Sequence, residues 1–203
     1  VGILPPEQEA LLEELRQFLD AFYQLPVRIA EPIVLSEHEK ARLQRVAVRG
    51  RFGPGETRCE TGALIDDILL PRLPDDAAVF LGVTAMKLTM GGEWVFGSTR
   101  LLQRVGVISV GRLAAEKDSA GSAKLLERAC KVAGHEAGHG FGLLHCVFYK
   151  CIFNTQGSVR VLDATPRQAC PVCLQKLDSV LAFDANKRAA TLRDFFRKNG
   201  IDK

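Results

Sequence analysis

Residues 135–145 read HEAGHGFGLLH, and this stretch decides the fold. On an α-helix, residues four apart lie on the same face, so His135 and His139 can present two imidazoles to one metal ion. Glu136 directly follows the first histidine, where its carboxylate can reach a metal-bound water without being a ligand itself. The segment therefore predicts a metal site on a helix with a carboxylate beside it.

A third ligand must come from outside this pair. Gly142 stands where the helix can end in a left-handed conformation, which would bring His145 back toward the same ion. Three neutral imidazoles leave a fourth position open, as in a catalytic zinc site. Zinc lowers the pKa of its water toward ~7 and polarises a carbonyl group, while Glu136 would move the proton from water to the leaving amine. The predicted reaction is metal-assisted amide hydrolysis.

A second set of soft ligands begins at the next residue. Cys146 is separated from Cys151 by four residues, and Cys170 is separated from Cys173 by two. Two such pairs are typical of a closed, structural zinc site with four thiolates. The segment 146–169 has little apolar periodicity, so metal binding would supply folding energy that its own core does not.

Two other interpretations of these cysteines remain open. The CPVC sequence at a helix start resembles the redox pair of thioredoxin-like proteins, although it leaves Cys146 and Cys151 unexplained. Alternatively, Cys146 could bind the first zinc in place of its neighbour. The other histidine and cysteines, His38, Cys59 and Cys130, lack spaced partners; we expect a solvated histidine and two small buried hydrophobic side chains.

The composition is that of an ordinary globular protein. The 203 residues are 47% hydrophobic and 25% charged, and the formal net charge is +3 without any basic run. One domain with a small appended part is expected, and nothing indicates a nucleic-acid partner. No stretch reaches the ~18 apolar residues of a membrane span, and residues 1–14 are acidic where a secretory signal is basic. We expect a cytoplasmic protein, most simply a monomer, whose cysteines bind metal in a reducing compartment.

Hydrophobic periodicity predicts helices at both ends of the chain and strands between them. Residues 7–23 repeat apolar side chains at three- and four-residue intervals, which is typical of an amphipathic helix. The sheet is expected mostly before residue 115. The other expected elements are an interrupted strand over 26–35, a loop over 50–62, a short helix over 63–70, strands over 77–84, 93–96 and 105–110, a helix over 123–143, an irregular segment to 168, and helices over 170–183 and 186–198.

Together, these residues resemble the archaemetzincins, a branch of the metzincin zinc peptidases. The long zinc motif, a cysteine directly after the third histidine, a second cysteine after four more residues and a distant CxxC pair all occur in order over residues 135–173. The stretches 94–97 and 107–113 are similar to family segments. The resemblance implies these roles: catalytic zinc at His135, His139 and His145, general base or acid at Glu136, and structural zinc at Cys146, Cys151, Cys170 and Cys173.

The resemblance also implies an architecture of the α/β (α+β) class. A metzincin has a twisted, mixed, mostly parallel sheet backed by helices, then the active-site helix, then a small helical subdomain that zinc stabilises here. The corresponding subdomains are residues 1–142 and 143–203. The edge strand that pairs with substrate is expected at Glu93–Gly97. In one departure, Phe153 stands where the family has a methionine beneath the catalytic zinc.

The predicted function is that of a zinc metallopeptidase with one catalytic and one structural zinc ion and a peptide or protein substrate. One alternative is a non-catalytic, zinc-stabilised module that binds peptides or a partner protein. Another is a zinc hydrolase of a non-peptide substrate. Glu136 favours an enzyme, because a binding module does not need that carboxylate.

Overall fold

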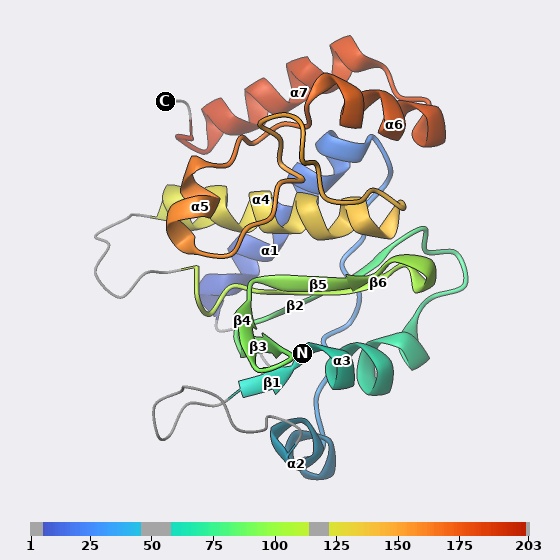
Figure 1. Cartoon of the computed structure of the whole chain (residues 1–203), viewed down its shortest axis with the longest axis vertical. Coiled ribbons are helices and arrows are strands. Elements are labelled where there is room, and N and C mark those ends of the chain that lie inside the picture. The colour runs from blue at the N-terminus through green and yellow to red at the C-terminus, as the bar shows by residue number, and fades with distance from the viewer. Residues whose placement is uncertain (1–5, 46–57, 114–121, 202–203) are drawn as a thin grey trace.

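The chain folds into helices and two small sheets, a mixed α/β arrangement (Figure 1). The structure is a computed structural model and describes residues 6–45, 58–113 and 122–201. Figure 1 shows α6 and α7 at one end, α1 and α4 between them and the sheets, and α2 and α3 at the opposite end. The helical elements are α1 (Pro6–Tyr23), α2 (Glu37–Arg45), α3 (Thr61–Ala63), α4 (Ser122–Gly140), α5 (Val159–Ala164), α6 (Pro171–Leu181) and α7 (Ala185–Lys198).

Each sheet has three described strands and combines one parallel pair with one antiparallel pair. The first has the order β1-β3-β4, and the second has the order β2-β6-β5. The strands are β1 (Arg58–Glu60), β2 (Phe80–Thr84), β3 (Lys87–Met90), β4 (Glu93–Val95), β5 (Gly97–Arg100) and β6 (Val105–Ser109). The stretch 93–97 therefore lies at sheet edges among the described strands. A mostly parallel sheet is not confirmed and stays a prediction.

Helix α4 lies at the centre of the structure. It packs against α1 on one side and against β5 and β6 on the other. Every residue of β6 is buried, and so is every residue of α4 from Arg128 to Gly140. Helix α1 buries Leu15, Phe18 and Phe22 against this core. The apolar periodicity of α1 and the apolar run of β6 thus fix α4 between two layers.

The C-terminal helices begin at side-chain caps. Asp184 accepts hydrogen bonds from the backbone N–H groups of Asn186 and Lys187 (2.9 and 3.0 Å), and α7 starts there. The Ser158 hydroxyl accepts from Val161 N (3.3 Å) at the start of α5. Such caps satisfy N–H groups that have no partner within the helix. Both predicted C-terminal helices are confirmed to within one or two residues, whereas α5 lies in the segment expected to be irregular.

The strand expected over 26–35 is wrong. These residues form neither helix nor strand, and most are exposed, with Leu35 buried at the end. Pro26 and Pro32 each lack the N–H that a sheet ladder needs, which explains why an apolar stretch stays out of both sheets. Helix α2 follows it in a polar stretch that carried no apolar pattern.

The segment before β2 differs in its details from the expectation. The loop expected over 50–62 lies partly outside the described residues, and its end forms β1 and the start of α3. The short helix expected over 63–70 extends over 61–72, through a π-helical turn and a 3₁₀ turn. Its last turn contains Pro71 at an N-terminal position of the 3₁₀ helix, where the missing N–H costs nothing. Within the described residues, no helix is both long and apolar enough to cross a membrane.

Candidate active site

Helix α4 carries His135 and His139 and ends in a turn that brings His145 back toward them. Leu143 N donates to Gly138 O (3.0 Å) and Gly142 N donates to His139 O (2.9 Å), which is a Schellman ending. Gly142 has a φ of 87°, the left-handed conformation expected of it. The chain then reverses, and the ring of His145 lies with its centroid 4.9 Å from that of His139.

The hydrogen bonds of the two buried histidines define their tautomers. His135 Nδ1 lies 2.8 Å from Ile152 O, and His139 Nδ1 lies 2.6 Å from Leu143 O. Because a carbonyl oxygen only accepts, both Nδ1 atoms carry hydrogen and both Nε2 atoms present lone pairs. Burial lowers the pKa of His135 to about 3 and also lowers the pKa of His139, so both rings are neutral.

The Nε2 atoms of His135 and His139 lie 2.9 Å apart, so their lone pairs are close together. Lone pairs at this separation repel unless a cation lies between them, and neutral imidazole nitrogens are preferred zinc ligands. A ring nitrogen of the exposed His145 completes the group, whose ligand atoms all lie within 4.8 Å of one another. These three side chains therefore fit a zinc ion with one position open to solvent.

Glu136 lies beside the histidines and contacts the edge strand β5. Its carboxylate oxygen Oε2 accepts a hydrogen bond from Thr99 Oγ1 at 2.7 Å. Burial raises the pKa of Glu136 to about 7, and the Thr99 hydrogen bond opposes this shift. Strand β5 comes this close because Gly97 has no side chain: a Cβ there would lie 2.6 Å from Glu136 Cγ. A carboxyl group with this pKa can both accept and release a proton near neutral pH.

Phe153 lies beneath the histidines in the place expected for a methionine. It is fully buried, and its ring centroid lies 6.0 Å from that of His135. The ring packs against Gly138 on α4, where a Cβ would lie 2.1 Å from Phe153 Cε1. The absence of a side chain at Gly138 thus makes room for an aromatic ring under the site.

The loop after α4 is fixed by one side-chain amide. Asn154 Nδ2 donates to Cys146 O (2.6 Å) and Tyr149 O (2.9 Å), while its Oδ1 accepts from Cys151 N (2.8 Å). Cys146 N in turn donates to Phe153 O (2.9 Å). These hydrogen bonds connect Cys146, the residue after His145, to Cys151 and Phe153.

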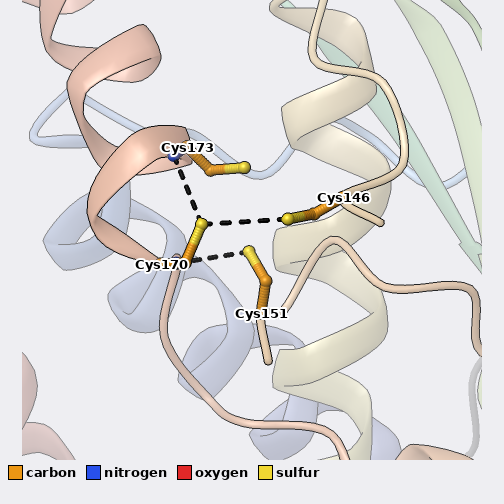
Figure 2. Close-up of side chains that lie close together, drawn as sticks. All are labelled: Cys146, Cys151, Cys170 and Cys173. Carbon is orange, nitrogen blue, oxygen red and sulfur yellow. Dashed lines mark hydrogen bonds between the residues drawn. The ribbon is translucent and has the colours of Figure 1, made fainter. Parts of the chain in front are cut away.

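The four predicted cysteines lie together, as Figure 2 shows. Cys146 and Cys151 come from the loop after α4, and Cys170 and Cys173 lie at the start of α6. Cys146 Sγ and Cys170 Sγ are 3.8 Å apart. With a Zn–S bond of about 2.3 Å, two ligands of a tetrahedron stand about 3.8 Å apart. Backbone N–H groups also point at sulfur, from Cys170 to Cys151 Sγ at 3.2 Å and from Cys173 to Cys170 Sγ at 3.5 Å.

This arrangement favours the four-thiolate interpretation over both alternatives. All four cysteines are free, and their sulfur atoms lie within 4.8 Å of one another, so the CPVC pair is not isolated as a redox pair would be. Cys146 groups with the other cysteines, and His145 groups with the histidines. Cys59 and Cys130 are buried hydrophobic residues as expected, and burial raises the pKa of each thiol. His38 is exposed on α2, which agrees with a solvated residue.

Comparison with known proteins identifies the family. The family model described as peptidase family M54 matches residues 74–179, just over half of the chain. The chain belongs to peptidase family M54. The matched region contains all seven predicted metal ligands and Glu136, and the resemblance to archaemetzincins is confirmed.

Several archaemetzincins resemble this chain. Archaemetzincin from Thermococcus kodakarensis is 29% identical in an alignment of 187 positions that covers 87% of this chain and 91% of the relative. Human archaemetzincin-2 is 27% identical in an alignment of 200 positions that covers 84% of this chain and 54% of the relative. The chain thus spans about half the length of the mammalian relatives it matches. The crystal structure of archaemetzincin from Methanopyrus kandleri superposes with a TM-score of 0.69 at 26% identity, covering 90% of this chain and 92% of that one.

Proposed function

We propose that this chain is a zinc-dependent metallopeptidase that hydrolyses peptide bonds in a peptide or protein substrate. The observation that carries the proposal is the pair of His135 and His139 Nε2 lone pairs facing each other at 2.9 Å, with Glu136 between them in sequence. Membership of peptidase family M54 supports it. Residues 1–142 and 143–203 would form the two subdomains of a metzincin-like fold, one supplying the buried histidines and the other His145 and the cysteines.

His135, His139 and His145 would hold the catalytic zinc. The bound ion would polarise the substrate carbonyl and acidify the attacking water. Glu136 would accept the water proton on a carboxylate oxygen and pass it to the leaving amine. The carbonyl groups of Ile152 and Leu143 keep the two imidazoles in the tautomer that offers Nε2.

The surroundings of the site support a peptide substrate. β5 is an edge strand of its described sheet, and the stretch Glu93–Gly97 leads into it, so an extended peptide could add to that edge. Leu144, Val147 and Phe148 flank His145 in sequence and are all more than 70% exposed. Exposed apolar side chains of this kind commonly mark a binding surface, here for apolar side chains of the substrate.

Cys146, Cys151, Cys170 and Cys173 would hold a second zinc ion with a structural role, which makes two ions per chain. The sulfur spacing and the N–H groups directed at sulfur support a site that binds thiolates. We also propose that the protein works in the cytoplasm, since a reducing compartment keeps these thiols available for metal. The cluster would stabilise the segment between α4 and α6 by joining the loop after α4 to the start of α6.

The test combines metal analysis with peptide cleavage by the zinc-loaded protein. We expect two zinc ions per chain, cleavage of some members of a broad peptide library, and a fall in kcat of about 10²-fold or more in Glu136→Gln. Glu9→Gln, an exposed change on α1, is the matched control and should retain full activity. The proposal fails if no peptide is cleaved or if Glu136→Gln is fully active. Peptide binding without cleavage would indicate the binding module, and hydrolysis of non-peptide acyl substrates alone would indicate the other hydrolase.

A further inference from the structure

The hydroxyl of Thr99 contacts the candidate acid–base residue at two points. Thr99 Oγ1 lies 2.7 Å from Glu136 Oε2 and 3.0 Å from the backbone oxygen Glu136 O. The two residues are 37 positions apart in the sequence, and the contact joins the edge strand β5 to the active-site helix α4. A contact with the backbone oxygen alone would only fix the helix against the sheet. The contact with Oε2 acts on the carboxyl group itself.

Two glycines give this contact its space. Gly97 and Thr99 are two residues apart on β5, so both face α4. A Cβ at Gly97 would lie 2.6 Å from Glu136 Cγ. Thr99 pairs across the sheet with Gly106 on β6, and a Cβ there would lie 2.4 Å from Thr99 Oγ1. A side chain at either glycine would push the hydroxyl or the carboxyl out of its place. Gly97 and Gly106 therefore leave the space that the Thr99–Glu136 contact occupies.

A threonine hydroxyl has one hydrogen and two acceptor lone pairs. It can donate to Oε2 when Glu136 is a carboxylate. When the carboxyl group holds a proton, the hydroxyl can accept from it and donate instead to Glu136 O, because both atoms lie within hydrogen-bond distance. Rotation about one C–O bond is enough to exchange the two arrangements. The same contact thus survives both forms that an acid–base residue takes during a reaction.

We propose that Thr99 is a positioning residue that holds the Glu136 carboxyl group in a fixed orientation through its hydrogen bond to Oε2. The proposal rests on the proposed peptidase function. Thr99 touches neither substrate nor metal in this role; it acts through Glu136. A carboxyl group held on one oxygen does not have to be reoriented between accepting the proton and releasing it, and a fixed orientation lowers the barrier to each transfer.

Thr99→Val and Thr99→Ser test the proposal. Valine keeps the shape of threonine and removes the hydroxyl, whereas serine keeps the hydroxyl and removes the methyl group. In Thr99→Val we expect kcat to fall about 10- to 100-fold, the effect of losing a hydrogen bond to a charged group, with KM and zinc content unchanged. In Thr99→Ser we expect kcat within about threefold of the wild type. If Thr99→Val does not fold, Thr99→Ala removes the same hydroxyl without adding a methyl group.

Crystal structures of the zinc-loaded wild type and Thr99→Val give a readout independent of activity. The Glu136 carboxyl group should leave its place beside β5 in the variant, while the histidines stay. An unmoved carboxyl group refutes the positioning role whether or not the wild type cleaves peptides. Failure of the wild type to cleave any peptide refutes the proposed function and leaves this structural comparison unaffected. Unchanged kcat in Thr99→Val, equal losses in Thr99→Val and Thr99→Ser, or loss of zinc from Thr99→Val would each overturn the proposal too.

Discussion

Gly138→Ala should destabilise the protein because the new methyl group meets the ring of Phe153. The Cβ would lie 2.1 Å from Cε1 and 2.6 Å from Cζ of a fully buried ring. Carbon atoms prefer about 3.5–4.0 Å, so either the ring or the helix must move. Overpacking of this kind costs about 1–3 kcal/mol, and so large an overlap puts the cost at the upper end.

The higher helix propensity of alanine offsets part of this destabilisation. Alanine is favoured over glycine inside a helix by about 1 kcal/mol, which leaves a net loss of about 2 kcal/mol in the free energy of unfolding. For a chain of this size, that loss lowers the Tm by about 4–8 °C. The value is measurable by urea denaturation of the zinc-loaded protein, followed by circular dichroism, and by calorimetry.

Phe153→Met separates the clash from other effects. Methionine is unbranched and flexible, so its chain can move away from a methyl group at position 138. In the Phe153→Met background, Gly138→Ala should lose much of its cost, with a coupling of about 1–2 kcal/mol between the sites. Gly134→Ala is the matched control, because its Cβ would approach Ile152 and Phe18 instead, at 3.0 and 3.2 Å. If Gly138→Ala stabilises the protein, or if Phe153→Met leaves its cost unchanged, Phe153 is not the residue that requires glycine at position 138.

Further predictions concern the metals and a partly buried ion pair. His139→Ala should remove one zinc ion, measured by metal analysis, without unfolding the protein. Cys170→Ser should remove the other ion and speed proteolysis of the C-terminal part. Loss of both ions from either variant would contradict the assignment of separate histidine and cysteine sites. Arg128 is 3% exposed and donates two hydrogen bonds to Asp163 (2.8 and 2.7 Å), which is 30% exposed. Arg128→Met should cost about 1–3 kcal/mol of stability in urea denaturation, and no measurable cost would refute this. The Arg128 hydrogen bond lowers the pKa of Asp163, so its stabilisation is complete above the unfolded pKa of about 3.9 and is lost as pH falls below it. In Asp163→Asn, the acid side of the stability profile should be flatter than in the wild type, and an unchanged slope would exclude this contribution.

The metal ligands were open to prediction because their geometry is local. Spacings of four on a helix, a glycine at the helix end and two cysteine pairs fix which side chains can meet, and the structure brings together the sets so predicted. Thr99 carried no such signal. Its contact with Glu136 depends on how β5 packs against α4, and a hydroxyl on a strand is usually a solvated residue. The glycines at 97 and 106 are the only local trace of that contact.

The sheet was harder to predict than the helices. β1 and β3 are only three and four residues long, too short for an alternating pattern to stand out. The residues of 26–35 have the composition of a strand, but their prolines remove the hydrogen bonds that would place them in a sheet. Helix α5 is only six residues long and follows a serine cap within a segment that has little apolar periodicity, so its position depends on its docking on α4.

The peptide bond between His145 and Cys146 joins the histidine cluster to the cysteine cluster. Under the proposed assignment, an ion held by the cysteines would add to the Asn154 hydrogen bonds that fix the loop carrying the third histidine, so losing that ion would also loosen the histidine site. When zinc is scarce, the fraction of active protein would then depend on the occupancy of both sites.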